Sequence, residues 1–557
     1  MNGAEAIIRC LELEGVEMVF SYPGGAVLSL FEALRNSNIK NVLTRTEQGA
    51  THIASGYARV AGKPGVCIAT SGPGATNLVT GLATAHMDSI PLVAITGQVP
   101  TSMIGTDAFQ EVDITGITKP ILKHSYLVTN TNDLPNIIRE AFHLAGTGRP
   151  GPVLIDVPKN IADAECKAKI PGEINLPGYK PTYRGHKSQI KMACKLLASA
   201  KKPLIYAGGG VVHSEAEELL LELAKRLDAP VAVTLMGKGA FPFKNDLYVG
   251  MLGLHGCPAA NMAVSHCDVL LAIGARFDDR VTGNLEKFAT NAKIIHIDID
   301  PAEIGKNVSP NIPIVGDASC VLEEMLKLLE QESHAEWLQQ IEGWKPMQLA
   351  VYQEIEDPKQ LSFRQVVDEF SRMTKGSAIV ATDVGQHQMV AAQFYKAQRA
   401  KGFLSSGGLG TMGYGLPAAV GAQLAAPEAL VACITGDGSF QMTMNELATA
   451  QAHQLPIKVI LSNNQNLGMV RQLQKYYVSE HYFGIDLTGN PDFAKIAEAY
   501  HMAYYCITKP EEVIPILSEA ISNGKLTLIE CMIPKEEMVY PMVLNGKGLD
   551  DMVVAGQ

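Results

Sequence analysis

Charged side chains are scarce in this 557-residue sequence. Only 18% of the residues are charged, and the formal net charge is −11 at pH 7. Nucleic acids and anionic membranes bind through clusters of basic side chains, and no Lys/Arg-rich run is present. The composition therefore argues against a nucleic-acid partner.

Disulfide, zinc and membrane signals are also missing. The ten cysteines form no C-x-x-C pair and no Cys/His spacing typical of a metal site, so buried thiols in a reducing compartment are expected. The N-terminus predicts an amphipathic helix followed by a strand, with no signal or transit segment, and no apolar run is long enough to span a bilayer. We expect a cytoplasmic protein with no membrane partner.

Short Val/Ile/Leu-rich runs recur along the chain, separated by stretches of helical periodicity. This pattern is typical of parallel strands that are covered on both faces by helices. The runs fall into three groups, which predict three sheets: 65–70, 91–96 and 151–157; 202–210, 230–235, 268–276 and 292–300; and 377–385, 430–439, 457–464 and 526–533.

The segments between these groups predict the domain boundaries. Residues 170–185 are rich in Pro and Gly and indicate an ordered linker, whereas residues 321–356 form a polar helical segment that contains Trp337 and Trp344. We expect an α/β protein of three doubly wound parallel-sheet domains, at about 1–165, 186–340 and 360–535, with a tail at 536–557.

The sequence "GDG" places Asp437 between Gly436 and Gly438 at the end of one predicted strand, and Asn464 follows the next strand. Ligands of parallel sheets bind beyond the carboxyl ends of the strands. A carboxylate and an amide oxygen can bind Mg²⁺ together with diphosphate oxygens. For GDG alone, an ordinary turn with an N-cap is the alternative interpretation.

GDG followed by the double asparagine at this spacing resembles the thiamine diphosphate-binding motif. Nearly the whole chain resembles the large, catalytic subunit of acetohydroxyacid synthase (acetolactate synthase), which implies the thiamine diphosphate-binding fold. By this resemblance Asp437, Asn464 and the carbonyl of Asn466 bind Mg²⁺. The resemblance also assigns thiamine diphosphate contacts to Gly385, Gln386, His387, Gly410, Met412, Gly436, Gly438, Ser439, Gly468 and Met469.

In the first predicted domain, Glu47 follows a short strand and begins a predicted helix. A glutamate there is often only a residue that complements the helix dipole. The resemblance instead matches Glu47 to the glutamate that hydrogen-bonds the aminopyrimidine ring and promotes its proton transfer. It also places Tyr22, Pro73, Asn77 and Gln110 near the cofactor or substrate, and Phe109 and Lys159 in the access channel. For several nearby glycines, the conformational needs of tight turns are the alternative explanation.

The middle domain carries a glycine loop at "YAGGGV", which alone is equally consistent with a tight turn. Two arginines in "RFDDR" straddle two aspartates and could alternatively form a surface ion-pair cluster. Together these stretches resemble the FAD-binding domain of the same family, in which "RFDDR" marks the biosynthetic, flavin-containing members. The FAD contacts implied are Gly208, Gly209, Gly210, Leu254, His255, Gly256, Arg276, Arg280, Val281, Asp298, Ile299 and Asp317.

Leu473 departs from the family pattern, since most members carry tryptophan at this place, and Leu467 is apolar where polar residues are common. A missing indole removes a flat wall from the substrate entrance. The resemblance therefore leaves the preference between acceptor ketoacids open and makes Leu473 the candidate specificity residue.

The resemblance implies decarboxylation of pyruvate and condensation with a second 2-ketoacid. The product is 2-acetolactate, or 2-aceto-2-hydroxybutyrate from 2-ketobutyrate, in branched-chain amino acid biosynthesis. It further implies a homodimer or homotetramer with the active site at the subunit interface, and a possible regulatory small subunit. The alternatives are an FAD-dependent pyruvate oxidase, another thiamine diphosphate 2-ketoacid decarboxylase, and a non-catalytic binding protein, against which the joint presence of Glu47, Asp437 and Asn464 argues.

Overall fold

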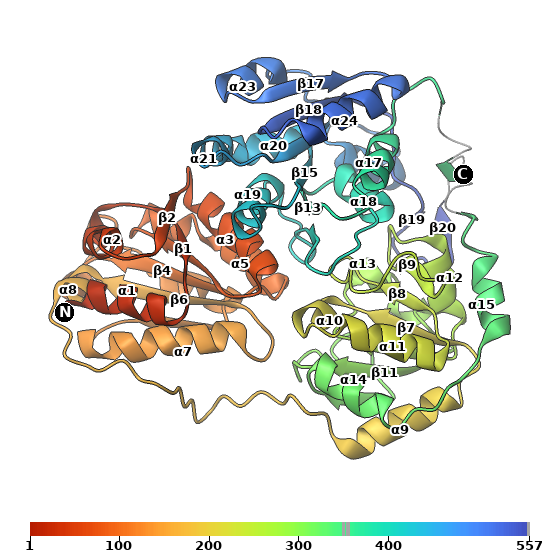
Figure 1. Ribbon diagram of the computed structural model, residues 1–557, viewed down its shortest axis with the longest axis horizontal. Coiled ribbons are helices and arrows are strands. Elements are labelled where there is room, and N and C mark those ends of the chain that lie inside the picture. The colour runs from red at the N-terminus through yellow and green to blue at the C-terminus, as the bar shows by residue number, and fades with distance from the viewer. Residues whose placement is uncertain (348–350, 353–356, 554–557) are drawn as a thin grey trace.

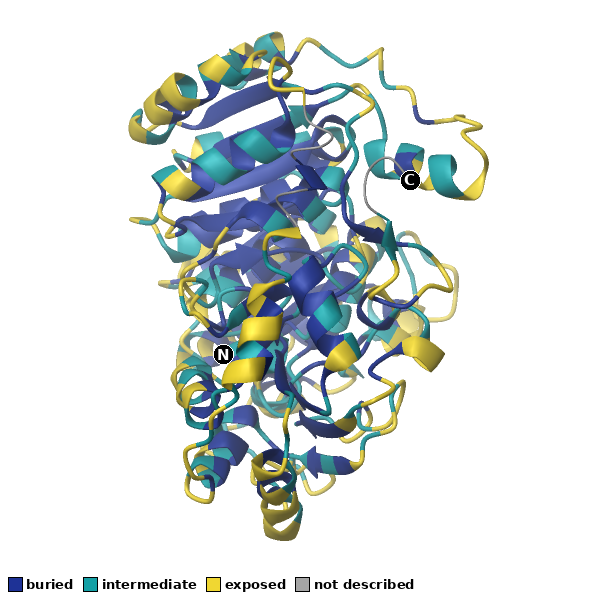
Figure 2. Cartoon of the chain, turned by 90° about the vertical axis from the view of Figure 1, so that its right-hand side faces the viewer, coloured by how far each residue is buried: buried dark blue, intermediate teal, exposed yellow. Residues whose placement is uncertain are grey.

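The computed structural model describes residues 1–347, 351–352 and 357–553. Its framework is three parallel sheets of six strands each, with helices packed on both faces of each sheet (Figure 1). The prediction of three doubly wound α/β domains is confirmed. Figure 2 shows the strands as the buried layer, with exposed residues on the outer faces of the helices.

The first sheet has the strand order β2-β1-β3-β4-β6-β5. Its inner strands β4 and β6 are buried at every position, as expected for strands covered on both faces. The strands are β1 (Met18–Tyr22), β2 (Lys40–Leu43), β3 (Gly65–Ala69), β4 (Leu92–Gln98), β5 (His124–Leu127) and β6 (Pro152–Pro158). The helices are α1 (Gly3–Leu13), α2 (Leu28–Arg35), α3 (Glu47–Ala61), α4 (Pro73–Thr76), α5 (Val79–Met87), α6 (Ile114–Thr118), α7 (Leu134–Gly146) and α8 (Lys159–Asp163).

The central sheet has the order β12-β11-β10-β7-β8-β9. Its strands are β7 (Pro203–Ala207), β8 (Val231–Val233), β9 (Tyr248–Met251), β10 (Val269–Ile273), β11 (Lys293–Asp298) and β12 (Ile312–Val315). The helices are α9 (Lys187–Ala198), α10 (Gly209–His213), α11 (Glu217–Leu227), α12 (Pro258–His266), α13 (Asp279–Thr282), α14 (Ala318–Leu326) and α15 (Ala335–Glu342).

The third sheet has the order β14-β13-β15-β16-β18-β17. Its strands are β13 (Ile379–Thr382), β14 (Phe403–Leu404), β15 (Val431–Gly436), β16 (Lys458–Asn463), β17 (Ala503–Ile507) and β18 (Thr527–Met532). The helices are α17 (Phe363–Met373), α18 (Gln386–Phe394), α19 (Gly415–Ala425), α20 (Asp437–Thr443), α21 (Leu447–Ala452), α22 (Gly468–Tyr477), α23 (Phe493–Ala499) and α24 (Val513–Ser522).

Helices α3 and α19 pack directly against each other and join the first domain to the third (Figure 1). Gly56 lies against the backbone of Ala418, and Gly421 lies against the carbonyl of Ile53. A Cβ atom at either glycine would overlap the opposing backbone, so only glycine allows this approach. The two domains are therefore held at a fixed spacing.

The predicted linker contains neither helix nor strand, yet it is tied to both flanking domains. The Tyr179 hydroxyl donates to the carbonyl of Thr147 at 2.7 Å, and the carbonyl of Tyr183 accepts from the amide of Asp317 at 2.8 Å. The tail forms a two-stranded antiparallel ribbon of β19 (Met542–Val543) and β20 (Met552–Val553). The end of the predicted tail, 554–557, and parts of the predicted helical segment, 348–350 and 353–356, lie outside the described residues.

The sequence predicted neither disulfide bonds nor membrane-spanning helices. All ten cysteines are free thiols, and seven of them are buried as predicted, whereas Cys257, Cys320 and Cys506 are partly exposed. Within the described part of the chain, no helix combines the length and apolar character that a membrane crossing needs.

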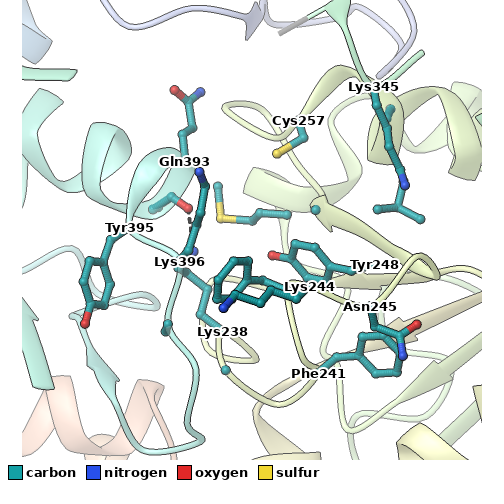
Figure 3. Close-up of a pocket in the computed structure, with 18 of the residues that line it drawn as sticks. Lys238, Phe241, Lys244, Asn245, Tyr248, Cys257, Lys345, Gln393, Tyr395 and Lys396 are labelled. Atoms are coloured by element: carbon teal, nitrogen blue, oxygen red, sulfur yellow. Dashed lines mark hydrogen bonds between the residues drawn. The ribbon is translucent and has the colours of Figure 1, made fainter. Parts of the chain in front are cut away.

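A cavity of about 390 Å³ lies between the central and third domains (Figure 3). Its walls come from the segment between β8 and β9, from the start of α12 and from the end of α18. None of the residues that the sequence singled out lines it.

Candidate functional site

Asp437 and Asn464 lie at the same edge of the third sheet. Strand β15 ends at Gly436 and strand β16 ends at Asn463, and the two strands pair in parallel with Gly436 opposite Ser462. The residues that follow them therefore emerge side by side. Helix α20 begins at Asp437, so its unpaired N-terminal amides point to the same place as the carboxylate.

The carboxylate of Asp437 is buried, with 2% of the residue exposed. It accepts a hydrogen bond of 2.7 Å from the side-chain amide of Asn490, and burial raises its pKa to about 6. A nearby cation would favour the charged form and lower that pKa. Asn490 was not predicted, because no motif marks the loop that carries it.

The turn after β16 directs amide oxygens toward this edge. The side-chain oxygen of Asn464 accepts from the amide of Asn466 at 3.0 Å, and the side-chain oxygen of Asn466 is buried without a partner among the described residues. No group of three His, Cys, Asp or Glu side chains that could hold a metal occurs in the described chain. One carboxylate with amide oxygens suits a hard cation that takes its other ligands from a bound diphosphate.

Gly436 and Gly468 allow neighbouring side chains to approach the edge beside Asp437 closely. A Cβ at Gly436 would lie 2.7 Å from the Nδ1 of His387, and one at Gly468 would lie 2.7 Å from the side-chain nitrogen of Asn464. Burial lowers the pKa of His387 to about 3, and its Nε2 has no partner within the described structure. A neutral imidazole with a free nitrogen fits a polar ligand here. The other residues predicted on this sheet edge and its loops are Gly385, Gln386, Gly410, Met412, Gly438, Ser439 and Met469.

Asp383 was missed by the sequence reasoning. It follows β13, is fully buried, and accepts hydrogen bonds from the amides of Gly413 at 2.7 Å and Val384 at 2.9 Å. Burial raises its pKa to about 6. Asp383 thus holds the loop that carries Met412 against the end of β13. Its position after a buried strand was the signal that could have identified it.

Glu47 is the first residue of α3 and is 9% exposed. Thr46 caps the helix by accepting from the amide of Gly49 at 2.9 Å. The carboxylate of Glu47 accepts from the side-chain amide of Asn77 at 2.9 Å, so two predicted residues are brought together. Pro73 begins α4 on the loop after β3.

Glu446, from the third domain, holds the start of α3. Its buried carboxylate accepts from the amide of Arg45 at 3.0 Å and 3.2 Å and from the amide of Thr46 at 3.0 Å. The Thr449 hydroxyl donates to it at 2.6 Å, and burial raises its pKa. This contact crosses between domains, and no sequence motif indicates it.

Other predicted residues lie at the surface of the single chain. Phe109 is 87% exposed, Tyr22 is 40% exposed and Leu473, on α22, is 38% exposed. Gln110 has a positive φ of 61° and packs against Gly72, and Lys159 begins α8. Among the described residues, no hydrogen bond or ion pair joins Phe109, Lys159 or Leu473 to Glu47 or Asp437.

The predicted flavin residues gather at the carboxyl edge of the central sheet. Gly208 and Gly210 approach Gly274 closely, since a Cβ at Gly210 would lie 2.6 Å from the Cα of Gly274. This close approach accounts for these glycines without a ligand, so the tight-turn alternative explains part of the motif. The remaining loop residues, after β7 and β9, are Gly209, Leu254, His255 and Gly256.

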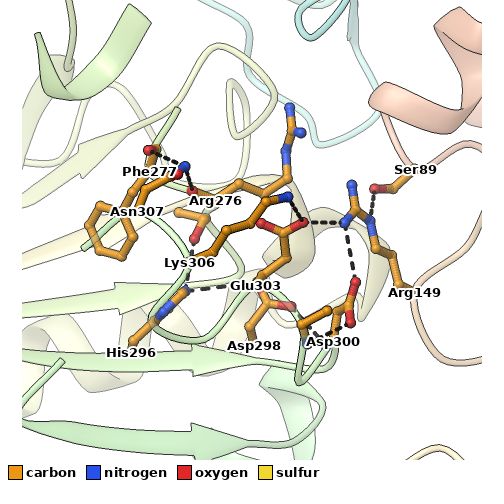
Figure 4. A network of polar contacts seen from close by, with 12 residues as sticks. Ser89, Arg149, Arg276, Phe277, His296, Asp298, Asp300, Glu303, Lys306 and Asn307 are labelled. Atoms are coloured by element: carbon orange, nitrogen blue, oxygen red, sulfur yellow. Dashed lines mark hydrogen bonds and ion pairs between the residues drawn. The ribbon is translucent and has the colours of Figure 1, made fainter. Parts of the chain in front are cut away.

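Of the two predicted flavin arginines, only Arg280 makes the exposed ion pair that the alternative interpretation expected. Arg280 is exposed and lies 3.5 Å from Asp279, while Arg276 makes no ion pair with any described residue. Figure 4 shows the guanidinium of Arg276 pointing away from the neighbouring carboxylates. Val281 is buried in α13, where Asp278 caps the helix by accepting from the amide of Arg280.

The predicted acids of this edge have different surroundings. Asp298 ends β11 and accepts from the amide of Asp300 at 2.9 Å, and burial raises its pKa to about 6. Ile299 follows it. The carboxylate of Asp317 instead caps α14 and accepts from the hydroxyl of Ser319 at 2.6 Å. Asp317 therefore has a structural role already.

An ion-pair network joins the first domain to the same edge (Figure 4). Arg149 lies 2.6 Å from Glu303 and 3.2 Å from Asp300, and its Nε donates to the Ser89 hydroxyl at 2.9 Å. Sequence reasoning did not identify Arg149, Asp300 or Glu303, because their pairing is distant in the chain.

Three family models match the chain in order. They are described as "Thiamine pyrophosphate enzyme, N-terminal TPP binding domain" at residues 1–117, "Thiamine pyrophosphate enzyme, central domain" at 190–325 and "Thiamine pyrophosphate enzyme, C-terminal TPP binding domain" at 383–531. The three matches fall on the three sheets.

Full-length relatives are similar over almost the whole chain. The acetolactate synthase isozyme 3 large subunit of Escherichia coli (strain K12) is 47% identical, covering 99% of this chain and 98% of that protein. The probable acetolactate synthase large subunit of Methanocaldococcus jannaschii is 49% identical, covering 99% and 95%. The acetolactate synthase large subunit of Haemophilus influenzae is 46% identical, covering 100% and 98%. With the sheet edges described above, these matches show that the chain belongs to the acetolactate synthase large-subunit family of thiamine pyrophosphate enzymes.

Proposed function

We propose that the chain catalyses acetolactate synthesis: it decarboxylates pyruvate and transfers the two-carbon unit to a second 2-ketoacid. With pyruvate as acceptor the product is 2-acetolactate, and with 2-ketobutyrate it is 2-aceto-2-hydroxybutyrate. The observation that carries the proposal is the convergence of Asp437 and Asn464 on one sheet edge in a chain 47% identical to an acetolactate synthase large subunit.

Thiamine diphosphate with Mg²⁺ fits the edge of the third sheet. Asp437, Asn464 and the carbonyl of Asn466 would hold the cation, and the amides and glycines around Gly436 and Gly468 would hold the diphosphate. When bound, the cofactor supplies an electron sink for the carbanion left by decarboxylation. The free nitrogen of His387 and the unpartnered oxygen of Asn466 support this fit.

Glu47 would hold a proton at the nitrogen of the cofactor's aminopyrimidine ring. Its carboxylate is buried at a helix start and is oriented by Asn77, so it meets the ring with a fixed direction. Glu446 fixes the backbone on which Glu47 stands. The first domain, about 1–165, would thus serve the pyrimidine ring, and the third, about 360–535, the diphosphate.

FAD fits the carboxyl edge of the central domain, about 186–340. Arg276 and Arg280 would meet its phosphates, and Asp298 would meet a ribose hydroxyl. The unpaired guanidinium of Arg276 supports this assignment. The proposed reaction has no net redox change, so FAD would have a structural role.

We further propose that two chains complete each active site. Phe109 and Leu473 are exposed in the single chain, which suits contact with a second chain. A homodimer or homotetramer follows. The "large subunit" names of the relatives support a small regulatory partner.

The test is to incubate the purified chain with pyruvate, thiamine diphosphate, Mg²⁺ and FAD, and to identify the C5 product by mass spectrometry. Formation of 2-acetolactate with no matching oxygen uptake is expected. Oxygen consumption or flavin reduction equal to turnover would instead identify a pyruvate oxidase, and acetaldehyde as the main product would identify a simple decarboxylase.

A further inference from the structure

The cavity between the central and third domains has a wall that is rich in lysine (Figure 3). Lys238, Lys244, Lys345 and Lys396 line it, and Asp246 is the one acidic residue among the lining residues. None of the residues assigned to the two cofactors lines the cavity, although the lining residue Gln393 donates to the carbonyl of His255 at 3.0 Å. Lys345 is paired with Glu342 at 2.7 Å, and Lys396 lies 3.4 Å from Asp368. The excess of positive charge in the cavity therefore comes mainly from Lys238 and Lys244.

Lys238 is the deepest of these cations, with 6% of the residue exposed. Its ammonium donates to the carbonyl of Ala392 at 2.7 Å and lies 5.2 Å from the ring centre of Phe403, and no carboxylate within the described chain pairs with it. An ammonium has three donors, so two remain for other partners. Burial lowers the pKa of Lys238 to about 8, which an anion in contact would raise again.

Lys458 shows how this chain satisfies a buried lysine that has only a structural role. Its ammonium donates to the side chain of Asn523 at 2.7 Å, to the carbonyl of Lys525 at 2.6 Å and to the Thr527 hydroxyl at 3.4 Å. All three donors are used. Lys238 has one such partner and faces a cavity instead.

Lys244 and Lys396 stand at the exposed rim. Lys244 makes no ion pair with a described residue, and Lys396 lies 3.4 Å from Asp368, whose side chain is 44% exposed. Such exposed pairs contribute little. The Lys244 ammonium is therefore available to a ligand in the cavity, and Lys396 would give up only an exposed ion pair to reach one.

The rest of the wall is apolar and aromatic, with Phe241, Tyr248 and Met251 among the lining residues. Binding sites for small molecules combine such surfaces with a few charged groups, in cavities of roughly 300–1,000 Å³. We propose that this cavity binds a small organic anion, with a carboxylate or phosphate group against Lys238 and its carbon body against Phe241, Tyr248 and Met251.

The position of the cavity couples it to both predicted cofactor loops. Helix α18 begins at Gln386, on the diphosphate edge, and its last turn, at Ala392 and Gln393, lines the cavity. Met251 and Cys257 also line it and flank the loop 253–256 of the proposed flavin site. An anion bound at Lys238 would brace the central domain against the third, which is a regulatory position. This inference does not depend on the reaction proposed above.

The test is calorimetric titration of the full-length protein, saturated with thiamine diphosphate, Mg²⁺ and FAD so that the other phosphate sites are filled. The probes are inorganic phosphate, AMP and succinate. We expect saturable binding of at least one probe, and a Kd at least tenfold weaker in Lys238→Met. Preference for phosphate and AMP over succinate identifies a phosphate ligand, and the reverse identifies a carboxylate.

Lys458→Met is the matched control, because it removes a buried ammonium outside the cavity, and its Kd should stay within twofold of the parent. The exposed double variant Lys244→Gln, Lys396→Gln should fold as the parent does and weaken binding three- to tenfold, which tests the site even if Lys238→Met is unstable. Three results would overturn the inference: no binding of any probe, unchanged affinity in the cavity variants, or equal weakening in Lys458→Met.

Discussion

The first and third domains share one topology and divide the chemistry between them. Numbered within each domain, both sheets have the strand order 2-1-3-4-6-5. In the first domain the acidic residue, Glu47, begins α3, the helix after the second strand. Helix α4, after the third strand, has no acidic residue in its first turn. In the third domain the pattern is reversed: α20 begins at Asp437, and α19 has no acid in its first turn.

The shared topology provides equivalent helix starts in the two domains. The side chain at each helix start decides what that position can bind or catalyse. Each carboxylate stands at a helix start beyond a strand end, where backbone amides and the helix dipole favour negative charge. Glu47 meets a neutral partner, Asn77, and suits proton transfer. Asp437 also accepts from a neutral amide, that of Asn490, but it shares its sheet edge with Asn464, whose amide oxygen can join it in holding a cation.

The strongest way to break this comparison is to remove the acid of the third domain. We expect Asp437→Ala to abolish Mg²⁺-dependent retention of thiamine diphosphate, and turnover with it, because the remaining amide and carbonyl oxygens cannot neutralise the dication. Equilibrium dialysis of the cofactor with and without Mg²⁺ measures this. FAD content should stay at the parent level, and retention equal to the parent would place the metal elsewhere.

Replacing the acid of the first domain should affect chemistry and leave cofactor binding intact. We expect Glu47→Gln to lower kcat by roughly two to four orders of magnitude, the range typical of a lost acid–base group. Steady-state kinetics at saturating cofactor gives the value, and dialysis supplies the control. A kcat close to that of the parent would exclude Glu47 from proton transfer.

Glu446 tests whether the position of Glu47 matters for turnover, because it holds the backbone just before Glu47 in place. We expect Glu446→Gln to lower kcat by about tenfold, since its amide replaces one of the oxygens that accept from Arg45 and Thr46. The Kd of thiamine diphosphate should change less than threefold. Thr449→Val, which leaves the carboxylate in place, is the milder control, and equal losses in both variants would indicate a general packing defect.

The smallest effect is expected at Leu473. One methylene in an apolar pocket is worth about 1–3 kcal/mol of discrimination, and leucine covers less of an acceptor's extra methyl group than an indole does. We expect Leu473→Trp to raise the ratio of 2-aceto-2-hydroxybutyrate to 2-acetolactate a few-fold in competition assays. Val470→Trp on the same exposed helix is the control. An unchanged ratio would remove Leu473 from the acceptor pocket.

Apolar runs and the polar residues that end them were enough to predict the three sheets and the residues at the strand ends. In the run 457–464, every residue up to Leu461 except Lys458 is apolar, because the strand is covered on both faces. Polar residues follow where the sheet edge begins. Asp437 and Asn464 could be placed on one edge from this pattern alone. Their metal and cofactor roles came from the family resemblance.

Contacts between distant parts of the chain could not be predicted in this way. Glu446 and Arg45 are 401 positions apart, and Arg149 and Glu303 are 154 apart, so no local periodicity links them. A local motif can also assign a residue to a ligand when its side chain is already engaged. Asp317 was assigned to FAD, but its carboxylate caps α14. The sequence reveals which groups are available, and the fold decides which are already engaged.

The crossing of α3 and α19 has a pseudo-twofold symmetry. Gly56 on α3 meets Ala418, and Gly421 on α19 meets Ile53, so each glycine stands three positions after the residue that faces the opposing glycine. Reciprocal contacts of this kind define an isologous interface, in which residue i of one partner meets j and j meets i. Two domains of equal strand order thus meet inside one polypeptide as the two halves of a homodimer would.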